Sequence, residues 1–364
     1  MRWPRGRTMI FGALALSMVA AACGDDGSAA GGATTPGGSE TTTAPALDKL
    51  TGTLRLGYLA NVTHAPAIIG EEEGIFAAAL GEGVDIEYTY FNAGTEAIEA
   101  LFAGAIDAAF VGPNPAINGF AQSGGEALRI VAGTTSGGAS LVVADGIDGP
   151  EDLAGKSLAT PSLGNTQDVA LRAWLSEQGY ETDETGGGDV SIRPQANADT
   201  LTAFKDGSID GAWVPEPWAT RLVLEGGGTV LVDERDLWPD GQFVTTHLIV
   251  GTDYLEANRG IVRGLIEGLL DAIDVANGDR EAAQVTTNAG IERITTKALA
   301  PETVSGAWEK MTFTSDPIAS SLAKSKDDAV AAGLLEDVDL DGIYDLSLLN
   351  EVLAERGEKE VEGL

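Results

Sequence analysis

The sequence predicts an α/β protein of two lobes, in which parallel β-sheets are covered by helices. Patterns typical of strands and helices alternate along the chain from residue 53 to residue 251. Two similar segments, GAIDAAFVGP at 104–113 and GSIDGAWVPE at 207–216, show that the two halves repeat one pattern. The chain has 364 residues. At about 150 residues per domain, this length suits two domains or lobes.

The individual elements follow from the spacing of apolar residues. Residues 84–91, VDIEYTYF, alternate with period two, as a half-buried strand does, whereas 65–80 carries apolar residues at helical spacing. The predicted strands are 53–59, 84–91, 107–112, 128–135, 139–144, 156–161, 189–195, 210–215, 229–234 and 243–251. The predicted helices are 65–80, 94–106, 114–124, 165–180, 199–209 and 217–227. After residue 258 the pattern is helical, and no further strand is predicted.

Composition excludes several classes of function. The net charge of −34 argues against nucleic acid as a partner, because phosphate binding needs clustered Lys and Arg. A single cysteine excludes a disulfide framework and a Cys-rich metal site, and two histidines leave little room for a His-based one. No cofactor is predicted. The chain contains no G-x-S-x-G, H-E-x-x-H or P-loop motif.

The first 22 residues are similar to a bacterial lipoprotein signal peptide. Arg2, Arg5 and Arg7 precede an apolar run, Met9–Ala22, which leads directly to Cys23. This pattern predicts lipid attachment to the Cys23 sulfur. The alternative is an ordinary secretory signal followed by an incidental cysteine.

Residues 23–47 are predicted to be a disordered linker. The segment consists mostly of Gly, Ser, Thr, Pro and Ala, and such a composition buries too little apolar surface to fold. A lipid anchor joined by a linker to a folded body predicts an extracytoplasmic protein held at the cell membrane.

Four segments together resemble the solute-binding proteins of bacterial ABC importers, in the nitrate, sulfonate and taurine group. They are GYLANVTHAPAIIGEEEGIF, NAGTEAIEALFAGAIDAAFVGPNPAI, PEDLAGKSLATPSLGNTQDVALRAWL and FKDGSIDGAWVPEPWA, and the resemblance covers residues 45–300. The similarity is nearest to the aliphatic-sulfonate binders. It implies a fold like the type II periplasmic binding proteins, with two doubly wound α/β lobes, two hinge crossings and a helical C-terminal segment.

The resemblance also implies a domain division and partners. Lobe 1 would comprise 48–137 plus 248–364, and lobe 2 would comprise 138–247. A small solute, such as an alkanesulfonate, would bind in the cleft between them. Closure of the lobes would then present the loaded protein to a membrane permease with its ATPase.

The candidate ligand-binding residues lie in loops after the predicted strands, where α/β sheets bind ligands. They are Asn61, Thr63, His64, Gly94, Thr95, Gly112, Asn114, Thr135, Ser136, Gly137, Ser140, Gly164, Asn165, Thr166, Trp213 and Glu216. These loops contain neither Lys nor Arg. An oxyanion would therefore be held by backbone N–H groups, hydroxyls and amides, with His64 as the one local candidate cation. Such coordination suits a monovalent sulfonate.

Several of these residues have alternative interpretations. Glu216, beside Trp213 and Trp218, could meet the ammonium of a zwitterion such as taurine, or could turn to solvent while the rings face an apolar tail. His64 could instead serve backbone groups at a helix start. Residues 136–140 could be only a crossing segment, and Trp213 could be core instead of cleft wall.

The functional hypothesis is a binding protein without catalysis. Alternative ligands are taurine, nitrate, bicarbonate and a pyrimidine precursor. An enzyme on the same fold is a weaker alternative, because the related pyrimidine-forming enzyme carries a cysteine-rich motif and Cys23 is the only cysteine here. The effector domain of a transcription regulator would need a DNA-binding segment in place of the predicted signal.

Overall fold

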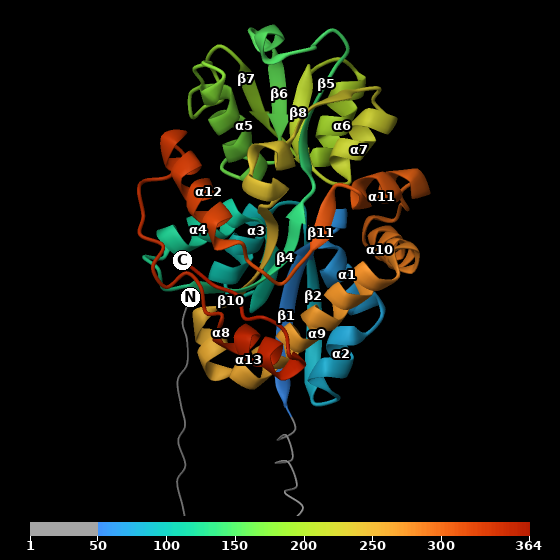
Figure 1. Ribbon diagram of the computed structural model, residues 1–364, viewed down its shortest axis with the longest axis vertical. Helices are drawn as coiled ribbons and strands as arrows, with labels where there is room; N and C mark the ends of the chain where they lie inside the picture. Colours follow the sequence, from blue (N-terminus) through green and yellow to red (C-terminus); the bar gives the residue numbers. More distant parts are fainter. Residues whose placement is uncertain (1–49) are drawn as a thin grey trace, which may run out of the picture. The chain divides into compact units, whose positions relative to one another are not determined.

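The computed structural model describes residues 50–364, which form two β-sheets with helices packed around them (Figure 1). The predicted signal peptide, linker and Cys23 lie outside the described residues. Among residues 50–364, no helix is both long enough and apolar enough to cross a bilayer.

The first sheet has six strands in the order β11-β4-β10-β3-β1-β2. Strands β1, β2 and β3 are parallel, whereas β10 is antiparallel to both β3 and β4, and β11 is antiparallel to β4. The bounds are β1 (Gly52–Leu59), β2 (Val84–Phe91), β3 (Ala108–Val111), β4 (Leu128–Gly137), β10 (Val244–Gly251) and β11 (Met311–Phe313). The sheet is therefore mixed, with an antiparallel strand at its centre.

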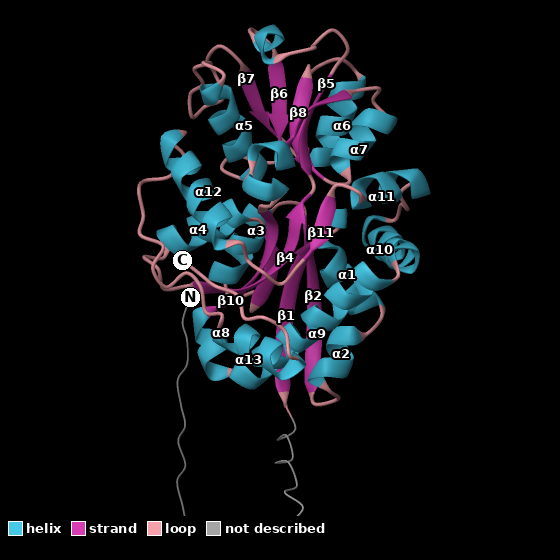
Figure 2. Cartoon of the chain, in the orientation of Figure 1, coloured by secondary structure: helices cyan, strands magenta, loops and turns pink. Residues whose placement is uncertain are grey.

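The second sheet has five strands in the order β7-β6-β8-β5-β9. Strand β6 is parallel to β7 and β8, and β5 is antiparallel to β8 and β9. The bounds are β5 (Ala139–Val143), β6 (Ser157–Thr160), β7 (Ser191–Pro194), β8 (Gly211–Pro215) and β9 (Thr229–Asp233). We call the first sheet with its helices the first lobe, and the second sheet with its helices the second lobe (Figure 2).

Helices cover both faces of each sheet. They are α1 (Ala65–Glu72), α2 (Ile75–Leu80), α3 (Gly94–Phe102), α4 (Pro113–Gln122), α5 (Thr166–Glu177), α6 (Asn197–Lys205), α7 (Trp218–Leu224), α8 (Thr252–Ala257), α9 (Arg259–Gly278), α10 (Arg280–Thr295), α11 (Pro301–Trp308), α12 (Ala319–Ala331) and α13 (Ser347–Arg356). Short 3₁₀ turns are η1 (Val62–His64), η2 (Pro150–Leu153), η3 (Glu234–Leu237) and η4 (Pro239–Gly241).

The core explains this layering. Successive strand residues point to opposite faces, so Phe110 packs with α1, α2 and α9, whereas Ala109 and Val111 pack with α3 and α4. In the second lobe, Leu141 packs with α5, and Val142 packs with α6 and α7. The predicted α/β architecture of two helix-covered sheets is confirmed.

Two crossings join the lobes. The chain leaves the first sheet at Gly137 and enters the second at Ala139. It returns between the end of β9 and Val244, because the hydrogen bonds of β10 with β4 already begin there. The predicted division at 247/248 falls inside β10, and the predicted lobe boundaries are otherwise untested.

Two local predictions were wrong. The helix expected at 65–80 is two helices, because Gly74 has a φ of 68°, a left-handed conformation that interrupts helical geometry. A further strand does follow residue 258. Met311–Phe313 pairs with residues 135–137 of β4, so tertiary pairing makes a strand of a segment too short to be recognised by pattern.

Candidate binding site between the two lobes

The carboxyl ends of strands from both sheets face each other and are in contact. The Trp218 indole Nε1 donates to Asn61 Oδ1 at 3.0 Å. Asn118 Nδ2 on α4 donates to the carbonyl oxygen of Gly164 at 3.2 Å, just before α5. These hydrogen bonds join the first lobe to the second, so the structure shows a closed arrangement of the lobes.

The N-termini of α4 and α5 meet at this junction. Gly112 caps α4 and Asn165 caps α5, where the Asn165 Oδ1 accepts the backbone N–H of Gln167 at 3.2 Å. A Cβ atom added to Gly112 would lie 2.4 Å from the Thr166 Oγ1. Two helix N-termini, each with outward-facing N–H groups, thus converge from opposite lobes.

A buried ion pair fixes the loop before α5. The Asp168 carboxylate accepts the Thr160 hydroxyl at 2.8 Å and the Gly164 N–H at 3.0 Å. It also pairs with the Arg172 Nε at 3.1 Å, and both side chains are almost wholly buried. The loop that carries Asn165 and Thr166 is therefore held by charge-assisted bonds.

Five buried polar atoms at the facing edges have no hydrogen-bond partner. They are Asn114 Oδ1, Thr134 Oγ1, Ser162 Oγ, Thr166 Oγ1 and His247 Nδ1. A buried polar atom without a hydrogen bond lowers the stability of a fold by about 1–3 kcal/mol, so most buried polar atoms in proteins have a partner. We take this set, with the two helix N-termini, as the candidate site.

Helix α12 covers one side of the candidate site. It packs against α4 of the first lobe and α5 of the second (Figure 1). Asn114 Nδ2 donates to the Ser325 carbonyl on α12 at 3.1 Å. The His247 Nε2 lies 3.3 Å from the carbonyl oxygen of Pro317, just before α12. The C-terminal segment therefore contributes to the junction, although no candidate site residue was predicted in it.

His64 is buried and uncharged. Burial lowers the pKa of its imidazole to about 3. Its Nδ1 accepts the backbone N–H of Leu59 at 3.5 Å, so its hydrogen resides on Nε2. The prediction of His64 as a local cation was therefore wrong, because a buried imidazole loses its charge when no carboxylate accompanies it.

The predicted hydroxyls near the first crossing mostly serve the fold. Thr135 Oγ1 donates to the Thr63 carbonyl at 2.7 Å, and the Ser136 Oγ accepts the N–H of Phe243 at 3.2 Å. Gly137 has a φ of 80°, which allows the chain to turn into the second sheet. Ser140 lies buried in β5. Ligand contact by these residues stays a prediction.

Gly94 and Thr95 lie at the N-terminus of α3. A Cβ atom on Gly94 would come within 2.8 Å of Pro115 Cγ, so this helix end packs closely on α4 within the first lobe. Thr95 is half-buried. Among the described residues, no hydrogen bond joins either of them to the second lobe.

Trp213 belongs to the core of the second lobe and not to a cleft wall. Its side chain is fully buried, its ring lies 6.0 Å from that of Trp174, and its Nε1 donates to Glu234 at 2.7 Å. We expected Trp213 at the cleft wall because it precedes a proline-bounded turn, but its ring lies on the face of β8 that packs against α5.

Glu216 is buried and bonded within its own turn. Its carboxylate accepts the backbone N–H of Thr220 at 3.0 Å and the Thr220 hydroxyl at 2.9 Å. Burial raises the pKa of this carboxyl to about 7. The alternative in which Glu216 turns to solvent is therefore wrong, and a contact with a ligand ammonium remains a prediction.

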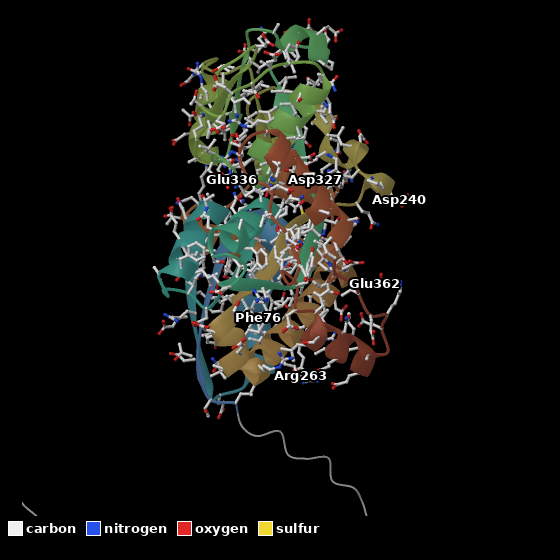
Figure 3. The ribbon with its side chains drawn as sticks, turned by 90° about the vertical axis from the view of Figure 1, so that its left-hand side faces the viewer. Phe76, Asp240, Arg263, Asp327, Glu336 and Glu362 are labelled. Carbon is white, nitrogen blue, oxygen red and sulfur yellow. The ribbon has the colours of Figure 1, made fainter. Side chains whose placement is uncertain are left out.

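Basic side chains approach the first crossing from elsewhere. Arg235 Cδ would lie 3.2 Å from a Cβ on Gly137, but its guanidinium is paired with Asp233. The Lys310 Nζ also lies 3.7 Å from Asp233. Arg235 lines a hollow of about 510 Å³ together with Asp240, which lies in the projecting 3₁₀ turn η4 (Figure 3). The loops that carry the predicted ligand-binding residues lack Lys and Arg, but Arg235 approaches one of them at Gly137.

Comparison with known proteins assigns the chain to a family. Residues 49–290, which are 242 of the 364 residues, match the NMT1-like family. The chain belongs to the NMT1-like family. The resemblance identified from the sequence motifs is thereby confirmed.

The curated relatives are named as binding proteins. The taurine-binding periplasmic protein of Escherichia coli is 28% identical over 59% of this chain and 64% of its own length. The putative aliphatic sulfonates-binding protein of the same organism is 26% identical over 66% of this chain and 72% of its own. The bicarbonate-binding protein CmpA of Synechococcus elongatus is 23% identical over 64% and 55%. The chain thus spans a little under two thirds of the taurine-binding relative and about half of CmpA.

Solved structures share the fold. The alkanesulfonate-binding protein SsuA of Xanthomonas axonopodis matches with a TM-score of 0.65 and 21% identity, over 79% of this chain and 96% of its own. The nitrate-binding protein NrtA of Synechocystis matches with a TM-score of 0.68 and 18% identity, over 84% and 89%. The expected fold, like that of the periplasmic binding proteins, is confirmed.

Proposed function

We propose that this protein is the solute-binding component of an ABC importer and captures a small organic sulfonate between its lobes. The observation that carries the proposal is the meeting of the α4 and α5 N-termini across the lobes, next to buried hydroxyl and amide groups without partners. The names of the relatives support the same role.

The mechanism is hinge closure. The bonds from Trp218 to Asn61 and from Asn118 to Gly164 form only when the lobes are together. A solute that touches both lobes adds further contacts to that state and so shifts the population toward it. The two glycines at the first crossing, Gly137 and Gly138, have positive φ values that suit a bending point.

A monovalent sulfonate fits neutral coordination. The side chains at the helix ends include hydroxyls of Ser162 and Thr166, which can donate to a sulfonate oxygen alongside the N–H groups of α5. Taurine, nitrate, bicarbonate and a pyrimidine precursor are the competing ligands. Taurine and bicarbonate are favoured as competitors by the names of curated relatives.

The remaining parts of the proposal concern location and partners. The protein would act outside the cytoplasm, held at the membrane by lipid on Cys23, and would deliver its solute to a permease. It would bind without catalysis, in keeping with the curated relatives that are named as binding proteins. Recovery of unchanged solute after long incubation is the expected result.

A thermal-shift panel tests the ligand. The panel contains ethanesulfonate, taurine, nitrate, bicarbonate and an aminopyrimidine. A bound solute at about 1,000 times its Kd stabilises the folded state by about 4 kcal/mol, which gives a clear rise in Tm. A rise with ethanesulfonate or taurine supports the proposal. A flat response to every sulfonate would refute the sulfonate assignment.

A further inference from the structure

We infer that the first lobe recognises N–H donors on the solute, through Asn114 Oδ1 and His247 Nδ1. This inference rests on the proposed function and narrows it. It assigns the ligand to the class of small solutes that carry amine or amide hydrogens. It also makes Asn114 and His247 the specificity-determining residues of the site.

The orientation of the Asn114 amide is fixed by its neighbour. The carbonyl oxygen of Ser325 can only accept, so the group that contacts it at 3.1 Å must be the amide nitrogen. The Asn114 oxygen therefore points the other way. It is an acceptor, it has no partner, and the residue is 1% exposed.

The tautomer of His247 is fixed in the same way. Its Nε2 lies 3.3 Å from the Pro317 carbonyl, so Nε2 carries the hydrogen and donates it. The ring is fully buried and uncharged, which leaves Nδ1 with a lone pair. This nitrogen is also an acceptor without a partner.

The two acceptors belong to one patch of the first lobe. His247 in β10 pairs with Val111 at the end of β3, and Asn114 follows three residues later in the first turn of α4. Gly112 lies between Val111 and Asn114 in the chain, and the Thr166 Oγ1 of the second lobe lies close to it. Both side chains are also tied to the segment 317–325.

Two buried acceptors without partners on the same lobe favour a solute that donates hydrogen bonds. A bare oxyanion such as nitrate or ethanesulfonate has only lone pairs, so it would leave both atoms unpaired or place lone pairs against them. Hydroxyls and helix N–H groups of the second lobe can still hold an oxyanion at the other end. A solute with N–H groups at one end and an oxyanion at the other can pair with the acceptors of the first lobe and with the donors of the second lobe. Sites that hydrogen-bond a particular group of the solute discriminate strongly against analogues that lack it.

The test is a set of matched solutes on the full-length protein, measured by isothermal titration calorimetry. Taurine is compared with ethanesulfonate, which lacks the amine, and with N,N,N-trimethyltaurine, which keeps the positive charge but has no N–H. A second pair is 4-aminopyrimidine and pyrimidine. In whichever set binds, the N–H member should bind about tenfold tighter or more than its N–H-free partners.

Three outcomes are distinguishable. Tighter binding of the N–H members supports the inference. Equal or tighter binding of ethanesulfonate or trimethyltaurine would overturn the inference and leave the proposed function standing. Absence of binding by every member would overturn both.

Variants assign the effect to the two acceptors. Asn114→Leu and His247→Leu should each lower the ratio of affinities between taurine and ethanesulfonate by about tenfold. Asn118→Leu is the matched control on α4, since it removes a bond between the lobes and should lower both affinities while keeping the ratio within about twofold. Because a ratio is measured, partial loss of stability does not mimic the result. An unchanged ratio in both site variants would contradict the assignment.

Discussion

Replacement of Gly112 by alanine provides a steric test of lobe closure. Gly112 has a φ of −72° and a ψ of 166°, a conformation open to any residue, so alanine brings no backbone strain. Its Cβ would lie 2.4 Å from the Thr166 Oγ1 and 3.5 Å from the Thr245 carbonyl oxygen. The clash is therefore with the other lobe, and it exists only when the lobes are closed.

The expected loss of solute affinity in Gly112→Ala follows from the cost of overpacking. A methyl group forced into a packed interior costs about 1–3 kcal/mol. Thr166 is buried and branched at Cβ, so it has little freedom to turn aside. If this cost falls on the closed state alone, the affinity for solute should drop by about 5- to 150-fold. The thermal stability of the unliganded protein should change little.

The assay combines calorimetry with small-angle X-ray scattering. Gly112→Ala should bind taurine or ethanesulfonate more weakly and show a larger radius of gyration than the wild type in saturating solute. The control is Gly278→Ala, where a new Cβ meets nothing within 4 Å. Adding Thr166→Ala to Gly112→Ala removes the clashing oxygen and should restore compaction. Wild-type affinity and compaction in Gly112→Ala would refute the closed junction described above.

Three further predictions concern single side chains. Burial raises the pKa of Glu216 to about 7 from the ordinary value of 4.5, so the folded state holds an extra proton between these values and loses stability as pH rises through them. Glu216→Gln should remove this loss, so the Tm of the variant relative to wild type should rise from pH 4.5 to 7; a constant difference would disprove it. Trp213→Ala should destabilise the second lobe by about 3–5 kcal/mol in denaturant unfolding, because it empties a core position. Retention of wild-type stability would argue against that placement. Lys324→Met should weaken closure by about 0.5–1 kcal/mol, seen as a twofold to fivefold loss of solute affinity, because its Nζ on α12 lies 5.3 Å from the centre of the Trp238 ring in the segment that returns from β9 to β10. Unchanged affinity would show that this contact does not contribute.

The sequence predicted loops, but not individual atoms, for the candidate site. Gly112, Asn114 and Thr166 were predicted from their position after strands, and the structure brings them to one junction. Position after a strand is a topological property, because the carboxyl ends of parallel strands share one edge. Which of their atoms remain free depends on neighbours from distant segments. The Asn114 amide nitrogen, for example, donates to the carbonyl oxygen of Ser325, which lies 211 residues further along the chain.

The hydrogen-bond partner of His247 could not be predicted from the local sequence pattern. A histidine within the apolar strand FVTTHLIVG was the available signal, since a polar ring in such a run needs a partner. Its partner is the carbonyl of Pro317, 70 residues away, and no spacing rule links the two. The charge state of His64 was missed for a similar reason, because complete burial lowers a pKa and burial is a property of the folded chain.

Hydrophobic spacing and strand-to-helix order, which are local properties, were enough to predict two helix-covered sheets, whereas the family was predicted from the resemblance of four sequence segments. The folded chain alone decided that Trp213 points into a core, that β11 completes the first sheet and that α12 lies over both lobes. The physical reason is that these features are contacts between residues far apart in sequence, and their energies depend on which surfaces the whole chain brings together.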